Sequence, residues 1–104
     1  MKVIERKMLQ AVKLGKSADL GNTRIVAIDN SVKVYLFNNL IATLDGDTGT
    51  LDVITRYQSA TTKSRLNAIL REFANTSIHQ TNYVWFYSDK TYTNSGRTFY
   101  GITK

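Results

Sequence analysis

The sequence lacks cysteine and proline entirely, although it is 104 residues long. Without cysteine, disulfide bonds and thiolate metal sites are excluded, and a reducing compartment is permitted. Without proline, no turn depends on that residue and no slow prolyl isomerisation is expected. No apolar run approaches the roughly 20 residues of a membrane span. The first seven residues carry charge where a signal peptide needs its apolar centre. We therefore expect a cytoplasmic protein that does not enter a membrane.

Acidic residues are also scarce. Eight Asp and Glu stand against 14 Lys and Arg, which gives a formal net charge of +6. Such an excess favours polyanionic partners, either nucleic acid or an acidic or nucleoprotein partner. A net charge of about 2–8 is equally typical of a small domain that needs it only for solubility. The length and the 42% hydrophobic content predict one globular domain, residues 1–104.

Two stretches have the apolar spacing of α-helices. Residues 3–14 repeat an apolar side chain every fourth position, and Gly15 follows where a helix-ending glycine belongs. Residues 61–74 carry apolar side chains at i, i+3, i+4 and i+7, which predicts a central helix with one buried stripe. Thr61 or Thr62 is the expected N-cap, because its hydroxyl can accept from a free N–H of the first turn.

Between and after these helices the apolar period changes to two, which indicates β-strands. The expected strands cover residues 23–28, 31–37, 40–44 and 50–55, followed after the central helix by 77–80, 83–88 and 97–102. The expected turns are Asp29-Asn30, Asn38-Asn39 and residues 45–49. Residues 16–22 and 90–96 are expected to be loops. The pattern predicts an α+β fold: an N-terminal helix, an antiparallel four-strand meander, a central helix packed on the sheet, then two or three C-terminal strands.

Motifs that would support catalysis or metal binding are weak. The segment Asp45-Gly46-Asp47-Thr48-Gly49 superficially resembles the aspartate motif of haloacid-dehalogenase-like phosphatases, but Gly49 stands where Thr or Val is required. A calcium loop would need a glutamate where Arg56 stands. His79 is the only histidine, so neither a zinc site nor a catalytic triad has support. We expect a hairpin turn at residues 45–49, and no enzymatic activity, metal or cofactor.

The start of the central helix is the first candidate binding site. Lys63 and Arg65 stand in its first turn, at the positive end of the helix dipole, where cations are normally disfavoured. Free amide groups, hydroxyls and cations together would form a phosphate site. Arg71 continues the same polar face along the helix. A solvated helix face accounts for the same residues without any ligand.

The C-terminal third is the second candidate site, because it holds 7 of the 11 aromatic residues with cations interleaved. Rings on strands beside cations are typical of proteins that bind single-stranded nucleic acid. We predict stacking by Tyr83, Trp85, Tyr87 and Tyr92, with Arg97 as a nearby cation. The same rings are compatible with core packing between strands, or with anchors of a protein–protein contact.

Three segments resemble a loosely defined group of small phage-encoded proteins. They are Gly21-Asn22-Thr23, Asn39-Leu40-Ile41-Ala42 and Thr61-Thr62-Lys63-Ser64-Arg65-Leu66-Asn67-Ala68-Ile69-Leu70. In that group a Gly-Asn-Thr strand, a short hairpin and a Thr-Thr-x-x-Arg-Leu-Asn helix recur at similar spacing. The resemblance covers roughly residues 8–75 and leaves out the aromatic C-terminal third. It implies an accessory protein made in an infected bacterium, and it carries over no catalytic residues.

These observations leave three functional hypotheses. The leading one is a non-enzymatic phage accessory protein that binds nucleic acid through the basic helix face and the C-terminal aromatics. The second is an inhibitor that binds a host defence or nuclease complex, with the aromatics as anchors and the charges as a rim. The third is a structural protein that associates with itself, for example as a homodimer, because edge strands can pair between subunits.

Overall fold

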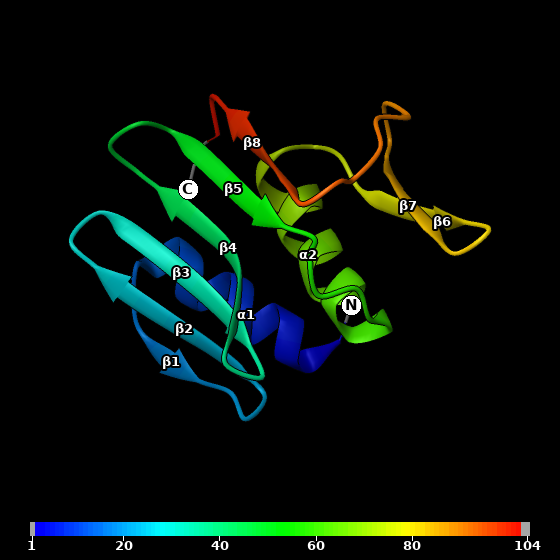
Figure 1. Cartoon of the computed structure of the whole chain (residues 1–104). Helices are drawn as coiled ribbons and strands as arrows, with labels where there is room; N and C mark the ends of the chain where they lie inside the picture. The colour runs from blue at the N-terminus through cyan, green and yellow to red at the C-terminus, as the bar shows by residue number, and fades with distance from the viewer. Residues whose placement is uncertain (1, 103–104) are drawn as a thin grey trace.

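The computed structural model describes residues 2–102, and it packs two helices against one side of a six-stranded antiparallel sheet (Figure 1). The elements are α1 (Val3–Leu14), β1 (Ala18–Asp19), β2 (Thr23–Ile28), β3 (Ser31–Leu36), β4 (Asn39–Asp45), β5 (Thr50–Ile54), α2 (Ala60–Phe73), β6 (Ile78–Thr81), β7 (Val84–Tyr87) and β8 (Gly96–Tyr100). The large sheet has the order β1-β2-β3-β4-β5-β8, and β6 pairs with β7 alone. The predicted α+β fold, with its meander and two helices, is confirmed.

The helix α1 has the predicted bounds. Met8 and Val12 lie on its buried side and are fully inaccessible to solvent. Gly15 follows with a φ of 64°, a left-handed conformation that glycine adopts without steric cost. Its N–H donates to the carbonyl oxygen of Val12 and so closes the helix end.

The helix α2 begins earlier than predicted. Its N-cap is Ser59, whose hydroxyl accepts from the N–H of Thr62 at 3.1 Å. The expectation of Thr61 or Thr62 as the cap is therefore wrong. Thr62 is 2% exposed, and its hydroxyl lies 2.9 Å from that of Ser59 inside the first turn. Serine and threonine are both good caps, so composition alone could not choose among these three neighbouring hydroxyl residues.

The turn between β3 and β4 lies one residue before the predicted position. Phe37 and Asn38 form it, with φ values of 48° and 65°, and Asn39 already pairs with Leu36. Positive φ at both positions matches a two-residue hairpin of the type that favours asparagine and glycine. This register keeps Leu36 on the core side, where it is 3% exposed, and leaves Phe37 in solvent.

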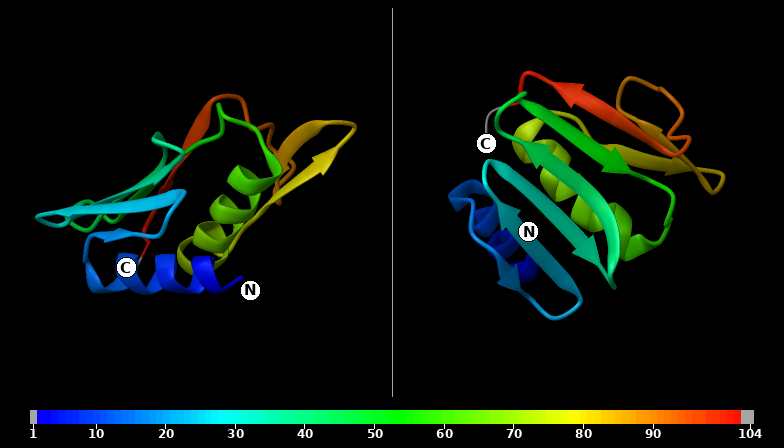
Figure 2. Two further views of the ribbon diagram at one scale, coloured as in Figure 1. Left: turned by 90° about the horizontal axis from the view of Figure 1, so that it is seen from below. Right: turned by 60° about the vertical axis from the view of Figure 1, so that its left-hand side comes forward.

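The two sides of the large sheet differ sharply in burial. The core side carries Ile25, Val34, Ala42 and Val53 in one row and Val32, Leu44 and Leu51 in the next. Both helices cover this side (Figure 2). The opposite side, here called the outer face, carries Val26, Lys33, Thr43, Asp52 and Thr98 in one row, Ile28, Ser31, Asp45, Thr50 and Tyr100 in a second, and Arg24, Tyr35 and Leu40 in a third. None of these outer-face residues is buried.

The C-terminal strands follow a path that the sequence did not reveal. After α2 the chain makes the β6–β7 hairpin, which projects away from the body, and then returns to add β8 beside β5 (Figures 1 and 2). The strand β8 is therefore an edge of the sheet. The opposite edge is β1, which lies inside the predicted loop 16–22 and pairs with β2 over two residues.

Candidate nucleic-acid interface

The inward face of the β6–β7 hairpin fixes it to the body. Ile78, Trp85 and Tyr87 are 3%, 4% and 1% exposed and belong to the hydrophobic core. The predicted stacking role of Trp85 and Tyr87 does not fit these positions, because a buried ring offers no face to a base. The alternation of the strand dictates the result: one face of β7 had to close the core, and it is the face with the larger rings.

The outward face of the same hairpin carries a series of three rings. His79 and Phe86 are paired across the strands, with centroids 5.9 Å apart and planes inclined by 25°. Phe86 is bridged in turn to Tyr92, whose ring centroid lies 6.1 Å away in an edge-to-face arrangement. Tyr92 is 60% exposed. Of these three rings the sequence had indicated only Tyr92, because the cross-strand register that brings His79 to Phe86 cannot be read from the sequence.

Tyr83 lies at the tip of the hairpin. Asn82 and Tyr83 form the two-residue turn, with φ values of 51° and 65°, and Tyr83 is 90% exposed. It does not share a strand face with Trp85, contrary to the sequence pattern. Its ring borders a hollow of about 290 Å³ at the start of α2, which is also lined by Gln58, Ser59, Ala60, Gln80 and Trp85.

Two predicted cations of α2, Lys63 and Arg71, flank the hairpin. The ammonium group of Lys63 donates to the side-chain oxygen of Gln80 in β6 at 3.1 Å. One turn further on, the amide of Asn67 donates to the carbonyl oxygen of Ile78 at 3.0 Å and accepts from its N–H at 2.6 Å. Arg71 comes one turn later and is exposed. The same face of α2 therefore holds β6 in place and presents a cation at each end of the contact.

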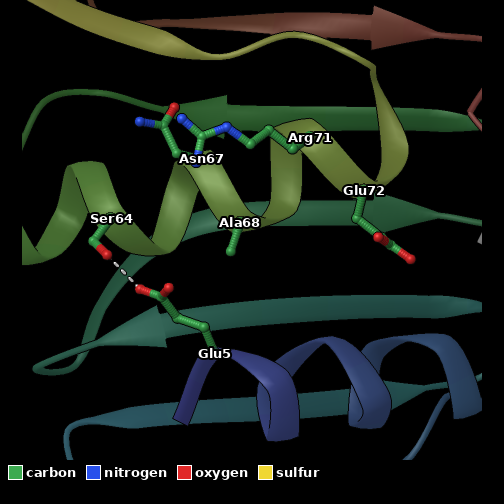
Figure 3. Close-up of a pocket in the computed structure, with 6 residues that line it drawn as sticks. All are labelled: Glu5, Ser64, Asn67, Ala68, Arg71 and Glu72. Carbon is green, nitrogen blue, oxygen red and sulfur yellow. Dashed lines mark hydrogen bonds between the residues drawn. The ribbon is translucent and has the colours of Figure 1, made fainter. Parts of the chain in front are cut away.

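Arg71 also borders a pocket of about 450 Å³ between the two helices, lined by Glu5, Ser64, Asn67, Ala68, Arg71 and Glu72 (Figure 3). The hydroxyl of Ser64 donates to the carboxylate of Glu5 across its floor. The side chain of Arg71 runs along α2 toward Asn67, away from Glu5 (Figure 3).

Arg65 occupies a different environment from the one predicted. It is 4% exposed, and its Nη1 lies 2.8 Å from Oε2 of Glu5 in α1. Its Nε donates to the hydroxyl of Thr23 in β2 at 3.0 Å. The predicted phosphate contact is wrong for this folded state, because the guanidinium is already paired inside the protein. Arg65 lies beside the apolar stripe of α2, and no local pattern indicated that Glu5 would meet it there.

Arg97 lies across the rings of Phe99 and Tyr87, with its guanidinium carbon 4.8 and 5.2 Å from their centroids. It also forms an ion pair with Asp89 at 2.8 Å. Hydrogen bonds from Thr91 and Arg97 lower the pKa of Asp89 to about 2. Burial raises the pKa of Tyr87 to about 12, although Arg97 opposes the shift. Arg97 therefore has a structural role that leaves less of its charge for a partner.

The loop at residues 45–49 is the predicted turn. The carboxylate of Asp45 accepts from the N–H groups of Asp47 and Thr48, and Asp47 accepts from the side chain of Asn30. Among residues 2–102 no group of three histidine or acidic side chains is placed to hold a metal ion.

Comparison with known proteins indicates the origin of the chain. The chain matches the family model described as "Kyanoviridae Gp96 protein" over residues 1–103. It belongs to that family. Membership of the Kyanoviridae Gp96 family supports the phage origin predicted from the sequence. No curated protein and no solved structure matches the chain. Neither helix of this family member, over residues 2–102, has the length and apolar character needed to cross a bilayer.

In this Gp96-family chain four segments lie side by side across the hairpin. Their order is α2, β6, β7 and then the segment that contains Tyr92. Three rings follow one another across this width, with Tyr83 at one end of the hairpin. Lys63 and Arg71 stand on the α2 side, and Lys90 stands in the turn after β7, where its N–H donates to the carbonyl oxygen of Tyr87. Such an arrangement can stack bases on rings and hold phosphates with cations on both sides.

Proposed function

We propose that this phage protein is not an enzyme and binds single-stranded nucleic acid through the outward face and tip of the β6–β7 hairpin. The observation that carries the proposal is the series His79, Phe86 and Tyr92, whose rings follow one another at 5.9 and 6.1 Å on a projecting hairpin. Rings offered in sequence on a strand surface suit successive unpaired bases, because every base has a stacking face. A duplex keeps its bases inside and offers no such faces, so we expect a preference for single strands.

The cations around the hairpin support the same proposal. Lys63, Arg71 and Lys90 stand on its two sides, where a strand crossing the rings would place its phosphates. The net charge of +6 adds a general attraction for any polyanion. Arg65 and Arg97 are left out of this set, since Glu5 and Asp89 already neutralise them.

The test is fluorescence anisotropy of labelled single-stranded DNA, single-stranded RNA and duplex DNA at near-physiological salt. We expect Tyr83→Ala and Tyr92→Ala each to weaken binding of single strands by about 5- to 150-fold, since one stacked base is worth about 1–3 kcal/mol. Tyr100→Ala is the matched control, because Tyr100 is 79% exposed but stands on β8, away from the hairpin. Equal losses for all three variants, or tighter binding of duplex, would contradict the proposal.

One observation also favours a second function, which is the inhibition of a host defence or nuclease complex by direct protein binding. Tyr83 is 90% exposed, and its tight turn fixes its backbone at a φ of 65°. A rigidly presented aromatic is also the usual anchor of a protein–protein contact. If this alternative holds, Tyr83→Ala should abolish capture of one specific protein from host lysate, and all three nucleic acids should bind only at low salt.

A further inference from the structure

Within residues 2–102 no element covers the outer face of the large sheet, and its charges are divided by sign. Arg24 on β2 and Lys33 on β3 lie on one side of β4, Asp52 on β5 lies on the other, and Asp45 lies on β4 itself. Lys33, Thr43 and Asp52 are consecutive members of one row, so the lysine and the aspartate flank the threonine symmetrically. A surface with such a division is complementary to a copy of itself that has been turned over.

Apolar side chains on the outer face have a matching arrangement. Ile28 on β2 and Tyr100 on β8 are the two ends of one row and are 64% and 79% exposed. The pair Ile28 and Tyr100 is related by reflection of the sheet across β4, as is the pair Lys33 and Asp52.

We propose that two copies of this chain form a two-fold symmetric dimer by packing their outer faces together, with the symmetry axis parallel to the strands along β4. That operation places β3 of one copy over β5 of the other and leaves each row in register. Lys33 then faces Asp52 of the second copy, twice by symmetry, and Ile28 faces Tyr100. Aligned sheets cross at about 30°, which displaces positions next to the axis very little.

Other placements of the axis are disfavoured by charge. An axis along β3 would set Lys33 against Lys33 of the other copy, and an axis between β3 and β4 would set Asp52 against Val26. The axis along β4 brings the two Asp45 side chains near each other. Their carboxylates are turned toward their own hairpins, where each accepts from the N–H groups of Asp47 and Thr48, so the repulsion is reduced.

The size of the face sets the expected affinity. With the axis along β4, five strands overlap and β1 extends beyond the contact. Strands about 4.8 Å apart, with about five residues of about 3.3 Å each, give a footprint of roughly 400 Å² per partner. That is about half the average of roughly 800 Å² per partner for stable interfaces and is typical of a weak, transient contact. We therefore expect a dissociation constant in the micromolar range, so that the dimer forms at the concentrations used for sedimentation and dissociates on dilution.

The test is sedimentation velocity of the full chain from low to high micromolar concentration, with charge exchange at the facing pair. We expect Lys33→Asp and Asp52→Lys each to weaken the dimer at least about tenfold, because each places like charges opposite one another twice. The double variant Lys33→Asp with Asp52→Lys should restore the affinity to within about threefold of the wild type. Lys7→Asp is the matched control, since Lys7 is exposed on α1 on the other side of the sheet. Circular dichroism verifies that every variant is folded.

A monomer at all concentrations would overturn the proposal. So would a dimer that tolerates both single exchanges, because it would then be formed by another surface, such as edge pairing through β8. A monomer in which Lys33→Asp reduces DNA binding would likewise overturn it, and would indicate that nucleic acid covers the outer face.

Discussion

Arg65 joins three elements of the protein at one point. It reaches from α2 to the carboxylate of Glu5 in α1 and to the hydroxyl of Thr23 in β2, and all three residues are at most 5% exposed. A charge removed from water is tolerated only if its partners replace the lost hydration. Glu5 receives that replacement from Arg65 at 2.8 Å and from Ser64 at 2.5 Å.

Removing one partner of this pair should therefore be costly. We expect Arg65→Met to lower the free energy of unfolding by about 3–5 kcal/mol, because the carboxylate of Glu5 would stay buried without its countercharge. The measurement is urea unfolding at neutral pH. Arg71→Met on the same helix is the control and should change stability by less than about 0.5 kcal/mol, since Arg71 is exposed. The double variant Glu5→Leu with Arg65→Met should recover much of the loss. Similar losses for the two single arginine variants would contradict this account of Arg65.

The phenolic hydroxyl of Tyr87 is a second unusual buried group. Among the described residues 2–102, no group meets the distance and angle of a hydrogen bond to its buried hydroxyl, although the Thr55 side chain lies near enough to oppose the shift, and burial raises its pKa to about 12. The folded state therefore holds the phenolic proton more tightly than the unfolded state, whose pKa is about 10. Stability from this residue is complete below pH 10 and falls as the pH rises from 10 to 12.

The variant Tyr87→Phe should remove the buried hydroxyl at little cost. We expect its stability at pH 7 to equal or exceed that of the wild type by up to about 1 kcal/mol, because no hydrogen bond is lost. Its stability should also decline less between pH 10 and 12 than that of the wild type. Thermal unfolding across this pH range measures both effects. Tyr83→Phe serves as the control for an exposed phenol, and equal alkaline slopes for the two variants would argue against the shifted pKa of Tyr87.

At the scale of elements, local pattern predicted most of the fold. The bounds of α1 and β2 follow from apolar periodicity and a terminal glycine, both of which act within a few residues. Errors arose where neighbouring residues compete for one role, as with Ser59 against Thr61 and Thr62 at the cap of α2. The strand β1 was missed because two residues carry no periodicity.

The candidate site was less predictable than the fold. The sequence indicated that the C-terminal aromatics matter, but it assigned Trp85 and Tyr87 to the binding face and they close the core. The exposed series depends on the pairing of His79 with Phe86 and of Phe86 with Tyr92, which are long-range contacts. Alternation along one strand reveals that two faces exist, and it cannot reveal which of them the rest of the protein covers.

The hairpin turn offers a way to separate stability from binding. Tyr83 has a φ of 65°, which costs a non-glycine residue roughly 1 kcal/mol, and its ring is 90% exposed. We expect Tyr83→Gly to create an Asn-Gly turn that stabilises the protein by about 0.5–1 kcal/mol. The same change should weaken binding of single-stranded nucleic acid as much as Tyr83→Ala. Urea unfolding and anisotropy measure the two quantities. A stabilised variant with undiminished binding would exclude Tyr83 from the site.

At the scale of the whole molecule, non-specific attraction by the net charge of +6 must be distinguished from binding of nucleic acid at a local site. A diffuse basic surface attracts any polyanion, and every cation then contributes similarly. The proposed local site would instead concentrate the effect in the few cations expected to touch phosphates, which are Lys63, Arg71 and Lys90 around the hairpin.

The salt dependence of binding distinguishes these two cases. Three phosphate contacts on a single strand predict a slope of about −2 for the logarithm of the association constant against that of salt concentration, since each contact contributes about −0.7. We expect Lys63→Gln to make the slope less steep by about 0.7 and Lys7→Gln, on α1, to leave it unchanged. Anisotropy titrations at four or more salt concentrations measure it. Because both substitutions remove one positive charge, equal changes in slope would mean that net charge, and not the hairpin, governs binding.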